Sequence, residues 1–231
     1  MSESRITPET PDTGPGSSPE AGGGKPVLLL DVDGVLNAFP TRSSRVDYTC
    51  HVIDGYRIHL HREVADMVEQ LRVHYDIVWF TLWNRKASPL IGPHVGLPNS
   101  PYFRTSFEVG AQILLEQGVA EEELALFMYA KTPLLPDLLD VGQRWVWIDD
   151  AHSEWDWAYL KKQGFDPGNF RLIRTDETAG LTWIEVHEAI DVARGWSEVG
   201  GGGERPSRRL TGSRRGPVRP GAVAGRADAV Q

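Results

Sequence analysis

The chain has 231 residues, of which 40% are hydrophobic and 24% charged, and its formal net charge is −8. That length suits one domain with a substantial core, and the acidic balance argues against a broad nucleic-acid-binding face on the fold itself. Cys50 is the single cysteine, which excludes an intrachain disulfide and a cysteine-rich zinc site.

Both ends of the chain have the composition of disordered segments. Residues 1–25 are rich in Pro, Gly, Ser and Thr and hold too few apolar side chains to form a core. Residues 196–231 contain a glycine run, followed by seven arginines against one Glu and one Asp. Such a tail is usually a solvated segment, but its charge also suits attraction to nucleic acid. We therefore expect one domain over 26–195, and we expect it in the cytoplasm because the sequence shows neither a signal peptide nor a membrane span.

The first part of the domain predicts two buried strands separated by a hairpin and a helix. Residues 26–30 form a continuous apolar run, as in a strand buried on both faces. Residues 48–60 alternate about Asp54-Gly55, which is a strong hairpin signal. Apolar residues at helical spacing follow over 61–74, and 76–82 reads as the second buried strand.

The middle of the domain gives weaker signals. Four prolines within 87–104 predict a loop. Thr105 and Glu108 have the spacing of a capping box, so we expect them to open a helix that Gly118 ends. The apolar run 124–129 predicts a short strand.

The last part of the domain predicts two more strands among three helices. The expected strands are 145–148 and 170–174, and the expected helices are 132–139, 153–163 and one from the capping-box pair Thr182 and Glu185 to about Arg194. Strands that are apolar throughout and alternate with helices predict a parallel sheet covered on both faces. The expected fold is therefore α/β, a three-layer Rossmann-like arrangement with a small β-hairpin flap and no large cap.

Carboxylates follow two of the predicted strands. Asp31 and Asp33 come after the first strand, and Asp149 and Asp150 come after the strand 145–148. Ligand sites of parallel sheets lie at the carboxyl ends of the strands, so these four side chains are expected to converge there. Such a cluster requires a cation, and an all-oxygen ligand set favours Mg²⁺. An Asp beside Mg²⁺ is able to form an aspartyl-phosphate, and a second Asp two residues on is able to act as general acid and base.

These residues resemble the motifs of the haloacid-dehalogenase (HAD) superfamily of phosphohydrolases. The segment from Asp31 to Leu36, Asp-Val-Asp-Gly-Val-Leu, resembles motif I, and Trp-Ile-Asp-Asp ending at Asp150 resembles motif IV. Thr81 resembles motif II, and Lys131, 18 residues ahead of Asp149, resembles motif III. The motifs occur in the order of the family, and the resemblance spans about 27–194.

The resemblance implies a role for each catalytic candidate. Asp31 would attack phosphorus, while Asp33 would protonate the leaving oxygen and later deprotonate the hydrolytic water. Thr81 and Lys131 would stabilise charge on the phosphoryl oxygens. From the sequence alone, Thr81 is also compatible with an ordinary hydroxyl at a strand end, and Lys131 is chosen because the other four lysines are poorly placed.

The resemblance also implies a magnesium site. Asp31, the backbone carbonyl of Asp33 and Asp149 would bind Mg²⁺, and Asp150 would either ligate the ion or support Asp149. Asp149 and Asp150 taken alone are equally compatible with an acidic pair at a helix N-terminus.

Other residues near the motifs are open to two interpretations. Trp83, Asn84 and Arg85 follow Thr81 and are candidates for substrate contact, and so is His152. The alternative for His152 is a solvent-exposed start of the next helix. The tryptophans within predicted strands are expected in the core rather than on a base-stacking surface.

The spacing of the motifs leaves no room for a large cap domain. The hairpin 48–60 would serve as a small flap, and an open site would admit bulky substrates such as nucleic-acid ends or phosphoproteins unless a second subunit closes it. The leading interpretation is a Mg²⁺-dependent phosphatase acting on an unidentified phosphomonoester. The alternatives are a phosphatase or repair module for nucleic-acid ends, and a non-catalytic HAD-fold binding or regulatory protein. The sequence leaves the oligomeric state open.

Overall fold

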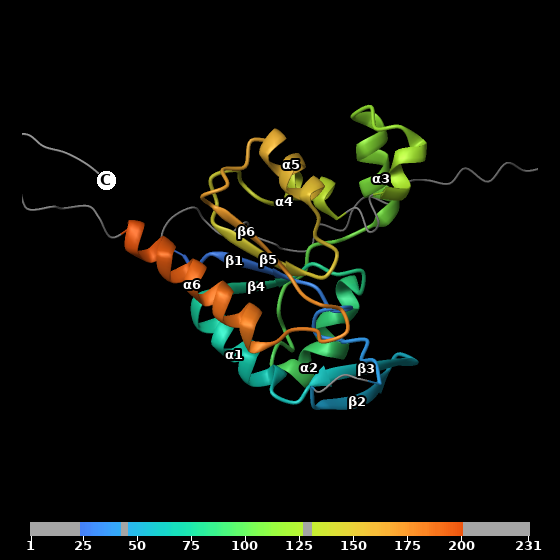
Figure 1. The fold of residues 1–231 in the computed structure, drawn as a ribbon, viewed down its shortest axis with the longest axis vertical. Coiled ribbons are helices and arrows are strands. Elements are labelled where there is room, and N and C mark those ends of the chain that lie inside the picture. The colour runs from blue at the N-terminus through green and yellow to red at the C-terminus, as the bar shows by residue number, and fades with distance from the viewer. Residues whose placement is uncertain (1–23, 43–45, 127–130, 201–231) are drawn as a thin grey trace, which may run out of the picture.

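A computed structural model describes residues 24–42, 46–126 and 131–200. Most of the two expected disordered segments, and part of the strand expected over 124–129, lie outside these residues. A sheet of four parallel strands lies between two groups of helices (Figure 1). The strand order is β4-β1-β5-β6, with β1 at Val27–Leu30, β4 at Asp76–Trp79, β5 at Trp145–Asp149 and β6 at Phe170–Arg174. The predicted α/β fold with helices on both faces is confirmed.

Each face of the sheet has its own core. Because successive side chains of a strand point to opposite faces, Leu28 and Leu30 of β1 enter one cluster and Val27 and Leu29 the other. The first cluster is covered by α1 (Val64–His74) and α6 (Trp183–Gly200), and the second by α4 (Leu135–Leu138) and α5 (Glu154–Lys162). The apolar runs of the strands are therefore explained by burial on both sides.

A hairpin separates β1 from α1. It consists of β2 (Tyr48–Ile53) and β3 (Tyr56–His61), and Asp54 and Gly55 at its turn both have positive φ, 52° and 84°. Two successive residues of this kind match the twist of the paired strands, as the sequence predicted. Within the residues that the structure describes, the hairpin forms the second of two sheets, and no separate cap domain is present.

The loop expected over 87–104 was partly wrong. This segment begins with a π-helix at Ala87–Ile91, labelled η2, and continues as α2 (Gly92–Val95). Pro89 and Pro93 lie in the first turns of η2 and α2, where no backbone N–H donor is needed. The overlooked signal was a stripe of buried residues four apart, namely Ala87, Ile91 and Val95.

Two further local predictions were wrong. Residues 124–126 of the expected strand belong to a 3₁₀-helix at Glu121–Leu126, η3, which starts with three glutamates and so suits the positive end of a helix. The helix α3 (Phe107–Glu116) is capped by Ser106 rather than Thr105, since the Ser106 hydroxyl accepts from the Val109 N–H. The Thr105 hydroxyl instead donates to the backbone carbonyl of Thr81 at 2.7 Å.

The last helix is longer than expected. Thr182 and Glu185 form the predicted capping interaction, with the Thr182 N–H 2.9 Å from Glu185 Oε2. The helix continues beyond Arg194 to Gly200, because Trp196 packs on the core and its indole N–H donates to the Gly168 carbonyl at 2.7 Å. Two short 3₁₀-helices, η1 (Asn84–Lys86) and η4 (Thr132–Leu134), complete the elements. No helix in the described parts of the chain is both long enough and apolar enough to cross a membrane.

Candidate functional site

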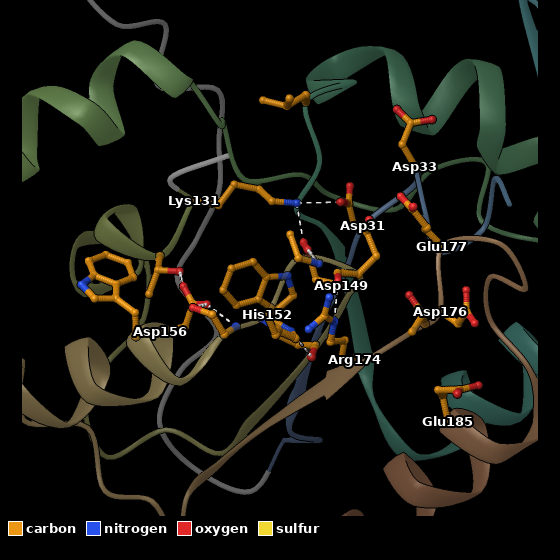
Figure 2. Close-up of a pocket in the computed structure, with 18 of the residues that line it drawn as sticks. Asp31, Asp33, Lys131, Asp149, His152, Asp156, Arg174, Asp176, Glu177 and Glu185 are labelled. Atoms are coloured by element: carbon orange, nitrogen blue, oxygen red, sulfur yellow. Dashed lines mark hydrogen bonds and ion pairs between the residues drawn. The ribbon is translucent and has the colours of Figure 1, made fainter. Parts of the chain in front are cut away.

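A cavity of about 1080 Å³ opens where the parallel strands end (Figure 2). Asp31 follows β1, Asp149 is the last residue of β5, and Arg174 is the last residue of β6. All three residues line the cavity together with Asp33 and Lys131. The fold therefore places the predicted carboxylates at the edge of the sheet where ligands bind in this architecture.

Lys131 links the ends of two strands. Its ammonium lies 2.7 Å from Asp31 Oδ2 and 2.5 Å from Asp149 Oδ2, and all three side chains are buried. The Phe80 carbonyl, 3.4 Å away, accepts from the same ammonium. An ammonium has three donors, so these three acceptors fix its position completely. Lys131 is placed here because the chain turns into η4 immediately after it.

Asp31 is held by donors at both of its oxygens. Its Oδ1 accepts from the Val32 N–H at 2.7 Å, and its Oδ2 accepts from Lys131. Thr81 is buried just beyond β4, and its hydroxyl acts to lower the pKa of this carboxylate. The structure therefore brings together Asp31, Thr81, Lys131 and Asp149, which the sequence assigned to four separate motifs. Their catalytic roles stay predictions.

Burial and charge act against each other in this group. Burial raises the pKa of Asp31 to about 7, and the negative charge of Asp149 adds to the rise, whereas Lys131 opposes it. For Asp149, burial also acts to raise the pKa, but the charges of Lys131 and His152 outweigh it and the pKa falls below its usual range. Burial and the charge of Asp149 raise the pKa of Asp150. One ammonium is thus too little positive charge for the carboxylates around it.

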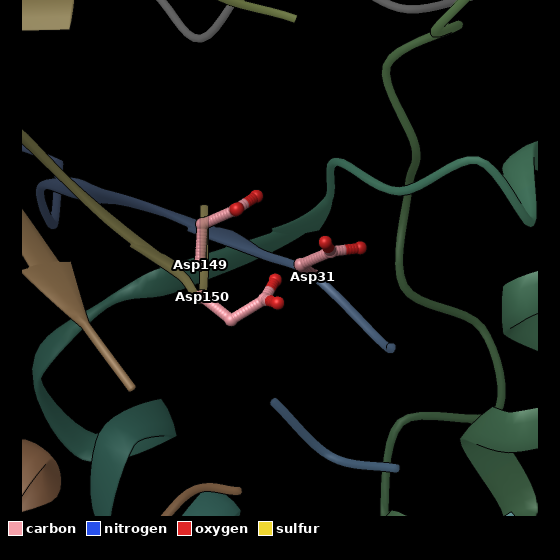
Figure 3. Close-up of side chains that lie close together, drawn as sticks. All are labelled: Asp31, Asp149 and Asp150. Carbon is pink, nitrogen blue, oxygen red and sulfur yellow. The ribbon is translucent and has the colours of Figure 1, made fainter. Parts of the chain in front are cut away.

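Three carboxylates form a set suited to a metal ion (Figure 3). One oxygen from each of Asp31, Asp149 and Asp150 lies within 4.8 Å of the others. Oxygen donors from several carboxylates are the ligands that hard divalent cations prefer. Because Lys131 supplies a single positive charge to this group, the residues present fit a divalent cation such as Mg²⁺.

Gly34 allows the third carboxylate to approach. A Cβ atom at this position would lie 2.3 Å from Cγ of Asp150, and the backbone of Gly34 has a φ of +74°. Both facts exclude any other residue without rearrangement. The Gly34 carbonyl also accepts from the Thr175 hydroxyl at 2.8 Å, which ties the loop after β1 to the end of β6.

The carboxylate of Asp33 lies apart from this cluster. Figure 2 shows it pointing away from the Lys131 ammonium that contacts Asp31. Its two oxygens accept from Asn37 Nδ2 at 2.7 Å and from Trp83 Nε1 at 2.8 Å. Asp33 still lines the cavity, so its side chain is free of the metal cluster and available to a ligand. The part expected of its backbone carbonyl in metal binding stays a prediction.

The other three residues proposed as substrate contacts, besides Trp83, have different environments. Asn84 adopts a φ of 47° and pairs with the backbone of Thr105 through both ends of its amide, which is a structural role. Arg85 is exposed, and it does not line the cavity among the described residues. His152 does line the cavity, but it is 7% exposed, so the alternative of a solvent-exposed helix start was wrong. Its Nε2 lies 3.1 Å from the Trp147 carbonyl.

Three residues at the site were not singled out from the sequence. Asn37 lies in the loop after motif I and contacts Asp33, and its spacing to Asp33 was the only signal. Arg174 is the last residue of β6, Thr175 follows it, and both residues line the cavity. Their position at the carboxyl end of a predicted strand, like that of Asp149, was a signal that could have identified them.

A family model described as the HAD domain in Swiss Army Knife RNA repair proteins matches residues 27–186. The chain belongs to this family. The match begins with β1 and ends inside α6, so it includes every residue of the site described above. No curated protein matches the chain. This match confirms that the chain belongs to the HAD superfamily, as the sequence motifs predicted.

Proposed function

We propose that the protein is a Mg²⁺-dependent phosphohydrolase that removes a terminal phosphate from RNA through an aspartyl-phosphate on Asp31. The observation that carries the proposal is the buried contact of Lys131 with both Asp31 and Asp149 at the carboxyl edge of the sheet. A structural domain gains little from such a group, because burying charge is unfavourable unless a ligand or partner compensates it.

The geometry supports a reaction in two steps. In the first, an oxygen of Asp31 attacks phosphorus, the bond from phosphorus to the leaving oxygen breaks, and Asp33 gives its proton to that oxygen. In the second, Asp33 takes a proton from water as the water oxygen attacks phosphorus. The bond to Asp31 then breaks, so that inorganic phosphate leaves and both aspartates return to their starting states. Lys131 and Thr81 lie beside Asp31, where they would stabilise charge on the phosphoryl oxygens.

Asp31, Asp149 and Asp150 would hold the Mg²⁺ ion. When bound, the ion supplies positive charge that stabilises phosphoryl oxygens and offsets the repulsion between the carboxylates. The chain's own contribution is to keep these oxygens close together and to hold Asp31 by a donor at each of its two oxygens.

Two observations favour an RNA end over a small phosphomonoester. The family to which the chain belongs is described from RNA repair proteins. Arg174 lines the cavity and is exposed, and no ion pair connects it with a carboxylate of the described residues. Since Lys131 is neutralised by two aspartates, Arg174 is the cation best placed for a second phosphate of a strand. The expected contribution of the arginine-rich tail lies outside the described residues and stays a prediction.

The test is a comparison of substrates with a matched pair of variants. Purified protein with Mg²⁺ is assayed on an aryl phosphate and on RNA oligonucleotides that carry a 3′- or a 5′-phosphate. Asp31→Asn should abolish all turnover, whereas Asp47→Asn, at an exposed aspartate paired with Arg62, should leave turnover unchanged. Turnover of the aryl phosphate alone would keep the phosphohydrolase and reject the RNA end. No Asp31-dependent turnover of any substrate would reject the enzyme and leave the non-catalytic binding protein.

A further inference from the structure

Two uncharged side chains donate hydrogen bonds to the carboxylate of Asp33, one to each oxygen. Asn37 Nδ2 lies 2.7 Å from Oδ1, and Trp83 Nε1 lies 2.8 Å from Oδ2. Asn37 lies four residues after Asp33 in the same loop, whereas Trp83 comes from the segment after β4, 50 residues away. The carboxylate is therefore oriented by one contact within its own loop and by one tertiary contact.

The direction of both hydrogen bonds is fixed. An indole nitrogen is a donor only, so Trp83 has one way to interact with a carboxylate. The amide of Asn37 is oriented by its other end, because Asn37 Oδ1 accepts from the His59 N–H at 2.9 Å. Asn37 is buried and cannot exchange this contact for water. The amide nitrogen must therefore face Asp33.

Trp83 is itself held on both sides in the chain. Before it, the hydroxyl of Thr81 lies 3.4 Å from the Trp83 N–H, and after it Asn84 is pinned to Thr105 in a left-handed backbone conformation. The ring of Trp83 is partly buried against the core. Because these contacts leave the Trp83 side chain little freedom to move, the position of its indole N–H determines the orientation of the Asp33 carboxylate.

The hairpin supports the outer side of this arrangement. The ring of Tyr56, beside the hairpin turn, meets the Trp83 ring edge-on with centroids 5.8 Å apart. Asp54 at the turn is paired with Lys86 at 2.7 Å, three residues beyond Trp83. The backbone of β3 also supplies the N–H that orients Asn37. Both donors to Asp33 are thus in contact with the β2–β3 hairpin.

We propose that Trp83 is a positioning residue that, together with Asn37, holds the Asp33 carboxylate toward the leaving oxygen, with the β2–β3 hairpin as its brace. The inference rests on the proposed phosphohydrolase activity and adds to it the residue that controls proton transfer. A fixed Asp33 matters most when the leaving oxygen needs a proton. Alkyl and sugar oxygens are poor leaving groups that need one, whereas a nitrophenolate leaves without protonation. Trp83 should therefore affect substrates in proportion to this need.

The test replaces the donor and compares two leaving groups. Trp83→Phe is assayed on a nitrophenyl phosphate and on a phosphorylated sugar or RNA end, with kcat measured at saturating Mg²⁺. We expect the kcat for the alkyl substrate to fall about 10- to 100-fold, and the kcat for the aryl substrate to change by less than about threefold. Trp183→Phe is the matched control, because Trp183 Nε1 donates to the Glu63 carboxylate at 3.0 Å away from the site. It should leave both values unchanged.

A second replacement guards against a folding defect in the first. Benzothienylalanine at position 83 keeps the bicyclic ring and replaces only the N–H, so the packing with Tyr56 and the core is preserved. The same selective loss on the alkyl substrate would support the proposal. Equal losses on both substrates, or no loss on either, would overturn the positioning role while Asp31-dependent turnover still upheld the phosphohydrolase. Absence of Asp31-dependent turnover in the wild type would instead reject the activity on which the proposal rests.

Discussion

Replacing Lys131 with methionine removes the cation that contacts both buried carboxylates, Asp31 and Asp149. Methionine fills much of the same volume, so the change is mainly one of charge. The side chain of Lys131 is 6% exposed, and the side chains of Asp31 and Asp149 are 10% and 2% exposed. Neither carboxylate can recover its lost contact by turning to water.

The magnitude follows from this burial. Removing one partner of a buried ion pair costs about 3–5 kcal/mol, because the remaining charge is left uncompensated. For a domain of this size, each kcal/mol corresponds to roughly 2–4 °C in melting temperature, so the midpoint should fall by about 6–20 °C without Mg²⁺. Because the site of Lys131→Met is more negative, added Mg²⁺ should raise its midpoint by more than it raises that of the wild type.

The measurement is thermal unfolding followed by circular dichroism, in chelator and in a series of Mg²⁺ concentrations. Lys86→Met is the matched control: Lys86 pairs with Asp54 at the same 2.7 Å as Lys131 with Asp31, but its side chain is 57% exposed. Solvent screens that pair, so its loss should leave the midpoint nearly unchanged. The reasoning is refuted if both lysine variants unfold alike, or if Mg²⁺ stabilises Lys131→Met no more than wild type.

Three further predictions concern the glycine, the metal and the substrate. Gly34→Ala should lower both the stability and the Mg²⁺ affinity, because the added Cβ clashes with Asp150. Gly55→Ala is the control: Gly55 also has a positive φ but open space around it, so this change should lower stability alone. Thermal melts with and without Mg²⁺ distinguish the two effects. Mg²⁺ should stabilise the wild type by about 2.7 kcal/mol at 100 times its dissociation constant, and Asp150→Asn should shift the titration to higher Mg²⁺; an unchanged titration contradicts the ligand set. Arg174→Ala should raise KM for a phosphorylated RNA end about tenfold, roughly 1.4 kcal/mol, while Arg171→Ala, whose guanidinium pairs with Glu188, should not.

The sheet and the centre of the site were predictable because they depend on local sequence. β1 and β5 are continuous apolar runs, since each is buried on both faces. Asp31 and Asp149 follow or end these strands, and parallel strands in one sheet bring such residues to the same edge. Lys131 could be chosen only through the resemblance and by elimination, because its contacts with both aspartates depend on the connection into η4.

The contact of Trp83 with Asp33 could not be predicted, because it is a tertiary contact between distant segments of the chain. The sequence offers Trp83 only as a candidate for substrate contact, and the fold shows that its indole donates to a residue 50 positions earlier. The helices within 87–104 were hidden by four prolines, although Pro89 and Pro93 occupy first turns where the missing N–H has no effect. The short apolar run 124–129 is compatible with a strand or a helix by its periodicity. The three glutamates ahead of it indicate the start of a helix, which the structure shows at Glu121–Leu126.

The most direct test of the central claim is detection of the covalent phosphoryl group on Asp31. Asp33→Asn is mixed with a nitrophenyl phosphate whose phosphorus is labelled, because this leaving group needs no proton and the loss of Asp33 slows hydrolysis of the intermediate. The reaction is quenched in acid, and the labelled peptide is mapped by mass spectrometry after treatment with hydroxylamine. The account predicts an acid-stable, hydroxylamine-sensitive label on Asp31 that forms only with Mg²⁺ and is absent from the Asp31→Asn variant. Release of nitrophenolate by Asp33→Asn without any label on Asp31 would contradict it.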